Sequence, residues 1–138
     1  MSAGAAASSV RGDRSFLAFD YGLRRVGVAS GNTVLGRAQP LRTIEAAGAA
    51  RFAVIGELVA QWQPDELVVG VPFHPDGAPN ENTERARRFA RQLRGRTGLS
   101  VHEVDERYTT VQAEAEGARD LDAAAAAVIL QQFLDHLP

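Results

Sequence analysis

The stretch over residues 16–30, FLAFDYGLRRVGVAS, most constrains what this chain can fold into. It opens with four apolar residues that predict a buried strand, and that strand ends at a single acid, Asp20. Gly22 predicts a tight turn, and residues 26–29 predict a returning strand. A carboxylate at the end of a core strand is costly to bury without a cation or a hydrogen-bond donor. The stretch therefore predicts either a hairpin in which Asp20 caps its own turn or a site in which Asp20 meets a ligand.

The elements downstream follow from hydrophobic periodicity and from glycine and proline breaks. A short strand over 33–35, a turn at Gly36 and an extended piece to Pro40 complete a three-stranded antiparallel meander. Apolar runs and helical repeats then predict a helix over 46–63 with Trp62 in the core, a strand over 66–71, a helix over 82–96, a strand over 100–104, a helical segment from Thr109 and a last helix over 121–137. Strand–helix–strand order is typical of parallel crossovers. We therefore expect an α/β fold with a mixed five-stranded sheet, the antiparallel three-strand meander plus two parallel strands, flanked by helices.

Composition is typical of a globular domain. The chain has 138 residues, of which 45% are hydrophobic. Residues 1–14 carry no apolar run and predict a disordered tail, which leaves residues 15–138 as a single domain. The absence of cysteine excludes disulfides and thiolate metal sites, and no apolar run approaches the roughly 20 residues that cross a membrane. We therefore expect a cytoplasmic protein with no membrane contact.

The net charge of −2 confines any nucleic-acid site to a local patch. Arg87, Arg91 and Arg94 recur at helical spacing, and such a stripe can track a phosphate backbone. A solvated face is the more common role of a charge run, however, and it is the favoured interpretation here. The loop over 72–77 follows the carboxyl end of a strand, where open α/β sheets place their ligands. Its His74 is a candidate ligand-binding side chain, with a solvated loop histidine as the alternative.

Three acids stand at comparable places in this pattern. Asp20 ends the first strand, Glu106 follows a later parallel strand, and Asp122 opens the last helix, where the helix dipole also favours an acid. If these strands are parallel, Asp20 and Glu106 share one edge, and the packed helix brings Asp122 beside them. Clustered carboxylates repel each other unless cations lie between them. Oxygen-only ligands suit Mg²⁺ or Mn²⁺, and two such ions activate water and stabilise the leaving oxygen of a phosphodiester.

Four segments, FDYGLRRVGVAS, VVGVPFHPDG, DERYTTVQAEA and DAAAAAVIL, closely resemble in this order the four motifs of the YqgF/RuvX family. The resemblance covers the chain from about Phe16 to the C-terminus. It implies an RNase H-like fold similar to that of the RuvC Holliday-junction resolvases. It also implies a nuclease that matures the 5′ end of pre-16S ribosomal RNA, with Asp20, Glu106 and Asp122 as the catalytic and metal-binding acids.

The resemblance implies roles for neighbouring residues as well. Gly22 would keep the turn tight beside the ion, and Arg24 or Arg25 would reach a phosphate of the substrate. Arg107 would orient Glu106 or contact the substrate. The glycines and prolines of the second motif would shape a substrate-facing loop.

One departure from the family pattern lies between Glu106 and Asp122. Relatives usually carry a longer connection there, often with a basic residue. Here residues 108–121 intervene, with Arg119 as the sole base. Shortening a surface loop by about ten residues changes stability little, so we expect the fold to form. The departure concerns substrate binding or activity instead.

Several interpretations remain open at the level of sequence. The leading one is a divalent-metal nuclease acting on ribosomal precursor RNA, and branched DNA as substrate would use the same site. A non-catalytic module of the same fold, binding ribosomal or transcription partners, is the third. The Asp-Tyr-Gly hairpin also resembles the phosphate loop of actin-like ATPases and sugar kinases, which need two such domains, more than 138 residues provide. Both a monomer and a homodimer are compatible with the sequence.

Overall fold

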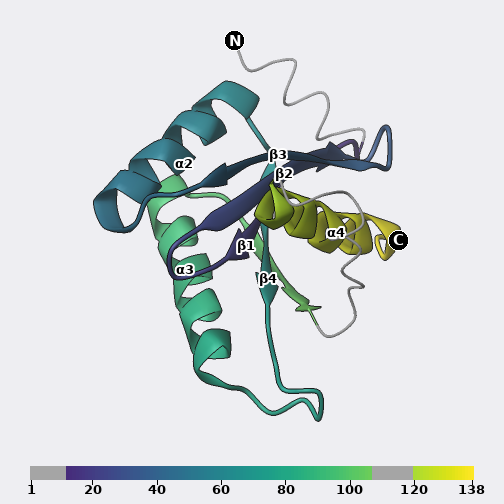
Figure 1. Ribbon diagram of the computed structural model, residues 1–138. Helices are drawn as coiled ribbons and strands as arrows, with labels where there is room; N and C mark the ends of the chain where they lie inside the picture. The colour runs from purple at the N-terminus through teal and green to yellow at the C-terminus, as the bar shows by residue number, and fades with distance from the viewer. Residues whose placement is uncertain (1–11, 107–119) are drawn as a thin grey trace.

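The computed structural model describes residues 12–106 and 120–138, which form a five-stranded sheet with helices on both faces (Figure 1). In chain order the elements are β1 (Ser15–Tyr21), β2 (Val26–Asn32), β3 (Ala38–Ile44), α2 (Gly48–Trp62), β4 (Glu66–Val71), α3 (Glu81–Thr97), β5 (Val101–Asp105) and α4 (Leu121–Asp135). The strand order across the sheet is β3-β2-β1-β4-β5. The first three strands form the antiparallel meander, and β4 and β5 run parallel to β1. The expected mixed sheet is confirmed.

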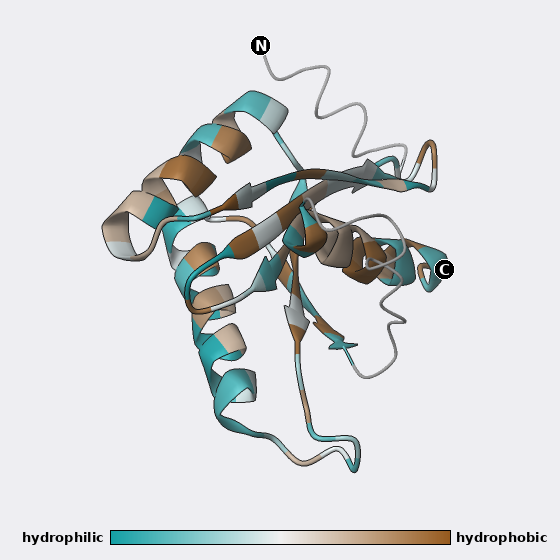
Figure 2. Ribbon diagram, viewed as in Figure 1, coloured by the Kyte–Doolittle hydropathy of each residue, from teal (hydrophilic) through white to brown (hydrophobic). Residues whose placement is uncertain are grey.

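Strand alternation divides the core into two layers. In β1, Leu17 and Phe19 belong to the cluster formed with α2 and α3, whereas Phe16 and Ala18 belong to the cluster formed with α4. Figure 1 shows α2 and α3 on one side of the sheet and α4 on the other. Figure 2 shows hydrophobic residues along the strands and alternating hydrophobic and hydrophilic residues along α3. By the same alternation, the next even-numbered position of β1, Asp20, lies on the α4 face.

Helix α3 has well-defined ends because its sequence supplies both caps. The side chain of Asn80 accepts a hydrogen bond from the Thr83 amide, and the Thr83 hydroxyl accepts one from the Asn80 amide, which forms a capping box. The Thr83 hydroxyl also donates to the carbonyl oxygen of Pro72 at the end of β4. Gly98 adopts the left-handed conformation that ends the helix. These contacts fix the start of α3 against the loop that follows β4.

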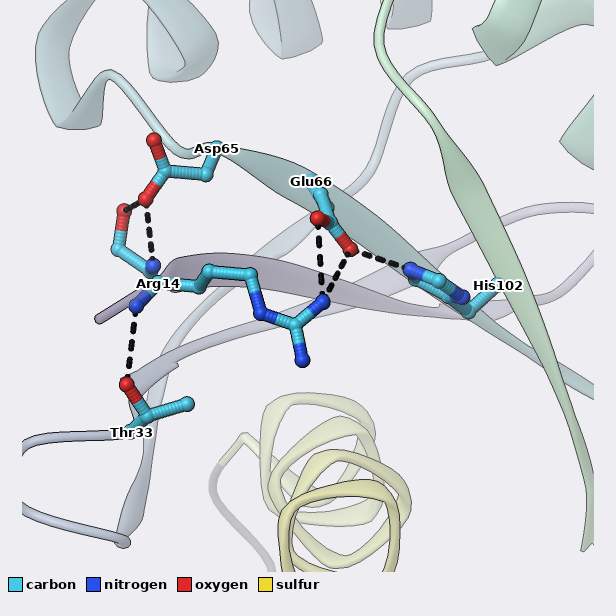
Figure 3. A network of polar contacts seen from close by, with 6 residues as sticks. Arg14, Thr33, Asp65, Glu66 and His102 are labelled. Atoms are coloured by element: carbon cyan, nitrogen blue, oxygen red, sulfur yellow. Dashed lines mark hydrogen bonds and ion pairs between the residues drawn. The ribbon is translucent and has the colours of Figure 1, made fainter. Parts of the chain in front are cut away.

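A polar network ties together the amino-terminal ends of the parallel strands (Figure 3). Arg14 Nη1 lies 3.1 Å and 3.2 Å from the two carboxylate oxygens of Glu66, and His102 bonds the same carboxylate. Burial raises the pKa of Glu66, but the hydrogen bonds from His102 and Arg14 outweigh it and hold that pKa below its usual range. The backbone amide of Arg14 donates to Thr33 Oγ1 at 2.9 Å. Arg14 is therefore held by the folded unit, while residues 1–11 of the expected tail lie outside the described residues.

The strand expected over 33–35 is wrong. These residues form a turn in which the Leu35 amide donates to Asn32 Oδ1 at 2.8 Å, an arrangement that asparagine favours. The third strand is β3 instead, and it lies at the edge of the sheet. An edge strand tolerates Pro40 because the backbone on its outer side forms no hydrogen bonds to another strand, so the N–H that proline lacks is not required there.

Trp62, which was expected in the core, is 44% exposed. In α4 the first residue, Leu121, is 39% exposed, and the helix packs on the sheet through its buried residues Ala123, Ala126, Ile129, Leu130 and Leu134. Small alanines there let the helix backbone approach the sheet closely. The helical segment expected from Thr109 lies outside the described residues.

Candidate active site

Asp20 lies inside β1, with a glycine beside it on each neighbouring strand. The strand runs one residue further than expected, to Tyr21, and pairs Asp20 with Gly27 of β2. On the other side, Phe19 pairs with Val69 of β4, which sets Asp20 beside Gly70. The row Gly27–Asp20–Gly70 therefore crosses the centre of the sheet on its α4 face.

Each of the two glycines makes room for another of the three acids. A Cβ atom at Gly70 would lie 2.8 Å from Oε2 of Glu106, so the Glu106 side chain extends over the β4 backbone toward Asp20. A Cβ atom at Gly27 would lie 1.8 Å from the carbonyl oxygen of Asp122, so the first turn of α4 rests directly on β2. Both glycines interrupt runs of valine, and a glycine inside a strand often marks a close approach. The two glycines are therefore a local signal in the sequence for the place where the acids approach the sheet. Gly70 makes room for Glu106 and does not shape the loop after β4.

Burial and repulsion by neighbouring acids raise the pKa values of two of these carboxyl groups, Asp20 and Glu106. Burial, followed by the charge of Asp122, raises the pKa of Asp20 to about 6. Burial, followed by the charges of Asp20 and Asp105, raises the pKa of Glu106 to about 7. Each of the three acids therefore takes part in an electrostatic interaction with another of the set, and the site favours an added cation.

Asp122 meets an arginine on the α4 face. Its Oδ2 lies 2.8 Å from Nε of Arg25, which follows the β1–β2 turn. Asp122 also lines an open hollow of about 420 Å³, together with Gly22, Leu23, Arg24 and Arg25. A Cβ atom at Gly22 would lie 2.6 Å from the Arg25 carbonyl oxygen, which confirms that the turn needs glycine. The hollow thus combines one carboxylate with two guanidinium groups beside the acid cluster.

The donor chemistry of the site suits a divalent cation, although the ligands are not pre-arranged around one point. Across residues 12–106 and 120–138, no group of three or more acidic or histidine side chains is positioned to hold an ion. The ion pair with Arg25 gives one reason, because it engages the Asp122 carboxylate. Three carboxylates with repelling charges nevertheless form an oxygen-only donor set of the kind that Mg²⁺ and Mn²⁺ prefer.

Among the described residues, His74 lies outside this cluster. His74 is exposed in the loop after β4, where its amide donates to the Ala78 carbonyl oxygen and its own carbonyl accepts from Gly77. Arg107 lies outside the described residues. Arg87 and Arg94 of the predicted basic stripe each form an ion pair with Glu103 at 3.4 Å, so their charges are matched by β5.

The raised pKa values predict that the free energy of unfolding falls as the pH rises without divalent cations. An acid with a higher pKa in the folded state binds more protons when folded, so its stabilising effect is complete below its unfolded pKa. For Asp20 the loss extends from its ordinary value of 3.8 to about 6, and for Glu106 from 4.5 to about 7. The shift of Asp20 corresponds to about 3 kcal/mol.

Urea unfolding in EDTA at about pH 5 and about pH 7.5 would measure this loss. Mg²⁺ or Mn²⁺ should restore stability at the higher pH and have little effect at the lower one. The same series on Asp20→Asn provides the control, since that variant should lose much of the pH dependence. Stability that rises over this interval in wild type and variant alike would contradict the prediction.

Comparison with known proteins assigns the chain to a family. Residues 14–136 match the family described as "RuvX: Holliday junction resolvase". The chain belongs to the RuvX family. A Polaromonas relative, named "Putative pre-16S rRNA nuclease", is 56% identical over 138 residues and aligns over 100% of both chains. A relative of the same name from Albidiferax ferrireducens is 64% identical over 121 residues, which cover 88% of this chain and 78% of the relative.

Solved structures show that this RuvX chain has an RNase H-like fold. RuvC from T. thermophilus, in complex with a Holliday junction substrate, superposes with a TM-score of 0.60 at 14% identity and covers 88% of this chain and 93% of RuvC. A second RuvC structure from Thermus thermophilus gives a TM-score of 0.52 at 13% identity, with 83% and 92% covered. The family and the fold together suggest dependence on a divalent metal. No helix among the described residues is long and apolar enough to span a bilayer.

Proposed function

We propose that this protein is a divalent-metal-dependent nuclease that hydrolyses phosphodiester bonds of RNA in the maturation of the 5′ end of pre-16S rRNA. The observation that carries the proposal is the position of Asp20 between two glycines, with Glu106 over one and the first turn of α4 over the other. The names of relatives 56% and 64% identical to this chain give the substrate. Residues 15–138 are taken as the nuclease domain, and the cytoplasm, where ribosomal precursors are processed, as its location.

In this proposal Asp20, Glu106 and Asp122 are the catalytic acids and hold Mg²⁺ or Mn²⁺. When bound, such an ion activates water for attack at phosphorus and stabilises the leaving oxygen. Asp20 and Glu106 lie close enough to repel each other, so binding of the cation would convert both to the ionised form at neutral pH. The partly buried setting strengthens this attraction by limiting solvent screening.

The residues around the hollow would position the scissile phosphate. Arg25 is a candidate exchange partner, because a substrate phosphate would compete with Asp122 for its guanidinium and release that carboxylate toward the metal. Arg24 lines the same hollow, and Gly22 lets the substrate backbone approach the turn. His74, in the loop after β4, and Arg107, which follows Glu106 in the sequence, are proposed as additional substrate contacts.

Comparing two substrates tests the proposal. Purified protein with Mg²⁺ or Mn²⁺ should shorten a 16S precursor RNA that carries its 5′ extension and leave a four-way DNA junction intact, with Asp20→Asn as the inactive control. If the protein cleaved only the junction, the proposed substrate would be branched DNA and not RNA. The family description favours that alternative. Binding of the RNA without cleavage under either metal would favour a non-catalytic module.

A further inference from the structure

A second hollow lies on the opposite face of the sheet from the acids, between the starts of α2 and α3. It has a volume of about 300 Å³, at the lower end of the range for ligand pockets. We call it the arginine groove. Its lining consists of Tyr21, Leu23, Gly48, Arg51, Phe52, Arg85, Arg88, Phe89 and Gln92. A groove of this size accommodates a short extended segment rather than a double helix.

The groove is positively charged although the chain as a whole is negative. Its lining contains three arginines and no acidic residue, against a net charge of −2 for the chain. Arg88 is exposed and has no ion-pair partner within the described part of the chain. Arg85 forms two exposed contacts within its own helix, a weak ion pair with Glu81 at 3.4 Å and a hydrogen bond to Asn82 Oδ1 at 3.2 Å, both of which water or a phosphate can replace. Both guanidinium groups are therefore available to a polyanion.

Aromatic rings form the floor of the groove. Phe89 lies at 5.0 Å from Tyr21 and 5.9 Å from Phe52, measured between ring centroids. Arginines already lie over one face of two of these rings, Arg96 over Phe52 at 4.1 Å and Arg51 over Tyr21 at 5.5 Å from guanidinium carbon to ring centroid, so a base would use the remaining ring surface. Aromatic faces beside arginines are the combination that proteins use to bind unpaired nucleotides, because every base offers a face for stacking. This composition favours a single strand over a duplex or a free phosphate.

Arg51 connects the groove to the acid site. Its side chain is buried, and it donates from Nε to the Ala46 carbonyl at 2.8 Å and from Nη2 to the Leu23 carbonyl at 2.9 Å. Arg51 thereby holds the β1–β2 turn against the start of α2. Leu23 in that turn lines both the arginine groove and the hollow that contains Asp122. The two hollows are therefore neighbours across a single exposed turn.

We propose that the arginine groove binds an unpaired strand of the nucleic-acid substrate, which passes over the β1–β2 turn from the acid site. The inference that this strand is RNA rests on the proposed function. Arg85 and Arg88 bind its phosphates, and the rings of Tyr21 and Phe52 contact its bases. The groove thereby selects substrates with a single-stranded flank next to the cleaved bond.

Binding without cleavage tests the groove directly. Fluorescence anisotropy of a short labelled single-stranded RNA is measured in EDTA, so that no metal supports hydrolysis. The double variant Arg85→Ala/Arg88→Ala should bind about tenfold more weakly and reduce the salt slope by about 1.4, because two phosphate contacts to a single strand are lost. The matched control Arg37→Ala/Arg91→Ala removes the same charge from exposed positions outside the groove and should bind within about twofold of wild type.

Two outcomes would overturn the inference: equal weakening in both double variants, or a duplex of the same sequence that binds wild type as tightly as the single strand. Cleavage of a dinucleotide with Mg²⁺ separates this result from the proposed function, because so short a substrate cannot occupy both hollows. Its turnover should be unchanged in Arg85→Ala/Arg88→Ala. If the wild-type protein binds RNA through the groove and cleaves no substrate, the proposed nuclease function is wrong, whereas the inference about the arginine groove still holds.

Discussion

Replacing Asp20 by asparagine is expected to abolish nuclease activity and at the same time to stabilise the metal-free protein. The side chain keeps its size and loses its charge, so the proposed metal site would lose the carboxylate at its centre. Substitution of residues that only support metal ligands costs about 10–100-fold in affinity or activity. Loss of a ligand itself should therefore lower the rate of RNA cleavage by at least about 100-fold.

The stability effect has the opposite sign because ionised Asp20 is unfavourable in the folded protein without a cation. Its pKa of about 6 means that near neutral pH the folded state holds a charge that burial and Asp122 both oppose. An uncharged amide removes this cost, and the gain should be about 1–3 kcal/mol at about pH 7.5 in EDTA. Thermal unfolding should show a midpoint several degrees higher than that of wild type.

Asp135→Asn is the matched control, since Asp135 is exposed at the far end of α4 and bonds only Gln131 among the described contacts. It should leave both activity and midpoint unchanged. Mg²⁺ should raise the midpoint of wild type more than that of Asp20→Asn. Asp20→Asn with wild-type cleavage, or with a lower midpoint in EDTA, would show that Asp20 does not have the proposed role.

The strands and the faces of this fold could be predicted because their patterns are local. The apolar run before Asp20 and the run over 66–71 each match a strand of the sheet. The face occupied by Asp20 then follows from alternation alone, once α4 is known to cover that face. The order of strand, helix and strand was enough to predict a parallel crossover, although it did not identify β1 as the strand that β4 pairs with.

Other features depended on contacts that no local pattern contains. Trp62 matched the helical repeat of the apolar face, yet it is the last residue of α2 and is 44% exposed. The predicted stripe of Arg87 and Arg94 proved to be paired with Glu103, which lies on β5, the next element along the chain. The arginines of the groove, Arg85 and Arg88, have the same helical spacing, so only the position of α2 distinguishes one face of α3 from the other.

Gly27→Ala is expected to have the largest effect on stability of any single methyl addition in the sheet. The new Cβ would lie 1.8 Å from the Asp122 carbonyl oxygen, 2.2 Å from its carbonyl carbon and 2.8 Å from the Ala123 amide nitrogen. These are backbone atoms, so no side-chain rotation can relieve the overlap, and α4 must move away from β2. Overpacking costs about 1–3 kcal/mol where side chains can adjust, and displacement of a helix should cost at least the upper value.

The displaced helix also covers one of the two core clusters and carries one of the acids. Ala126, Ile129 and Leu130 of α4 are buried against the sheet, so a shift at the first turn opens contacts along its length. Asp122 moves with that turn, and RNA cleavage should fall together with the unfolding midpoint. Urea unfolding measures the first effect, and cleavage at a temperature where the variant remains folded measures the second.

Gly56→Ala is the control for Gly27→Ala, because it replaces glycine by alanine at a position where no steric overlap results. Gly56 lies within α2, and a Cβ atom there would meet nothing within 4 Å. Alanine in a helix interior is favoured over glycine by up to about 1 kcal/mol, so this variant should be slightly more stable than wild type. The same chemical change thus shifts stability in opposite directions at the two positions, because only Gly27 is covered by the backbone of α4. If Gly27→Ala unfolded within about 1 kcal/mol of wild type, α4 could not rest on β2 at this distance, and Asp122 would lose the contact that sets it beside Asp20.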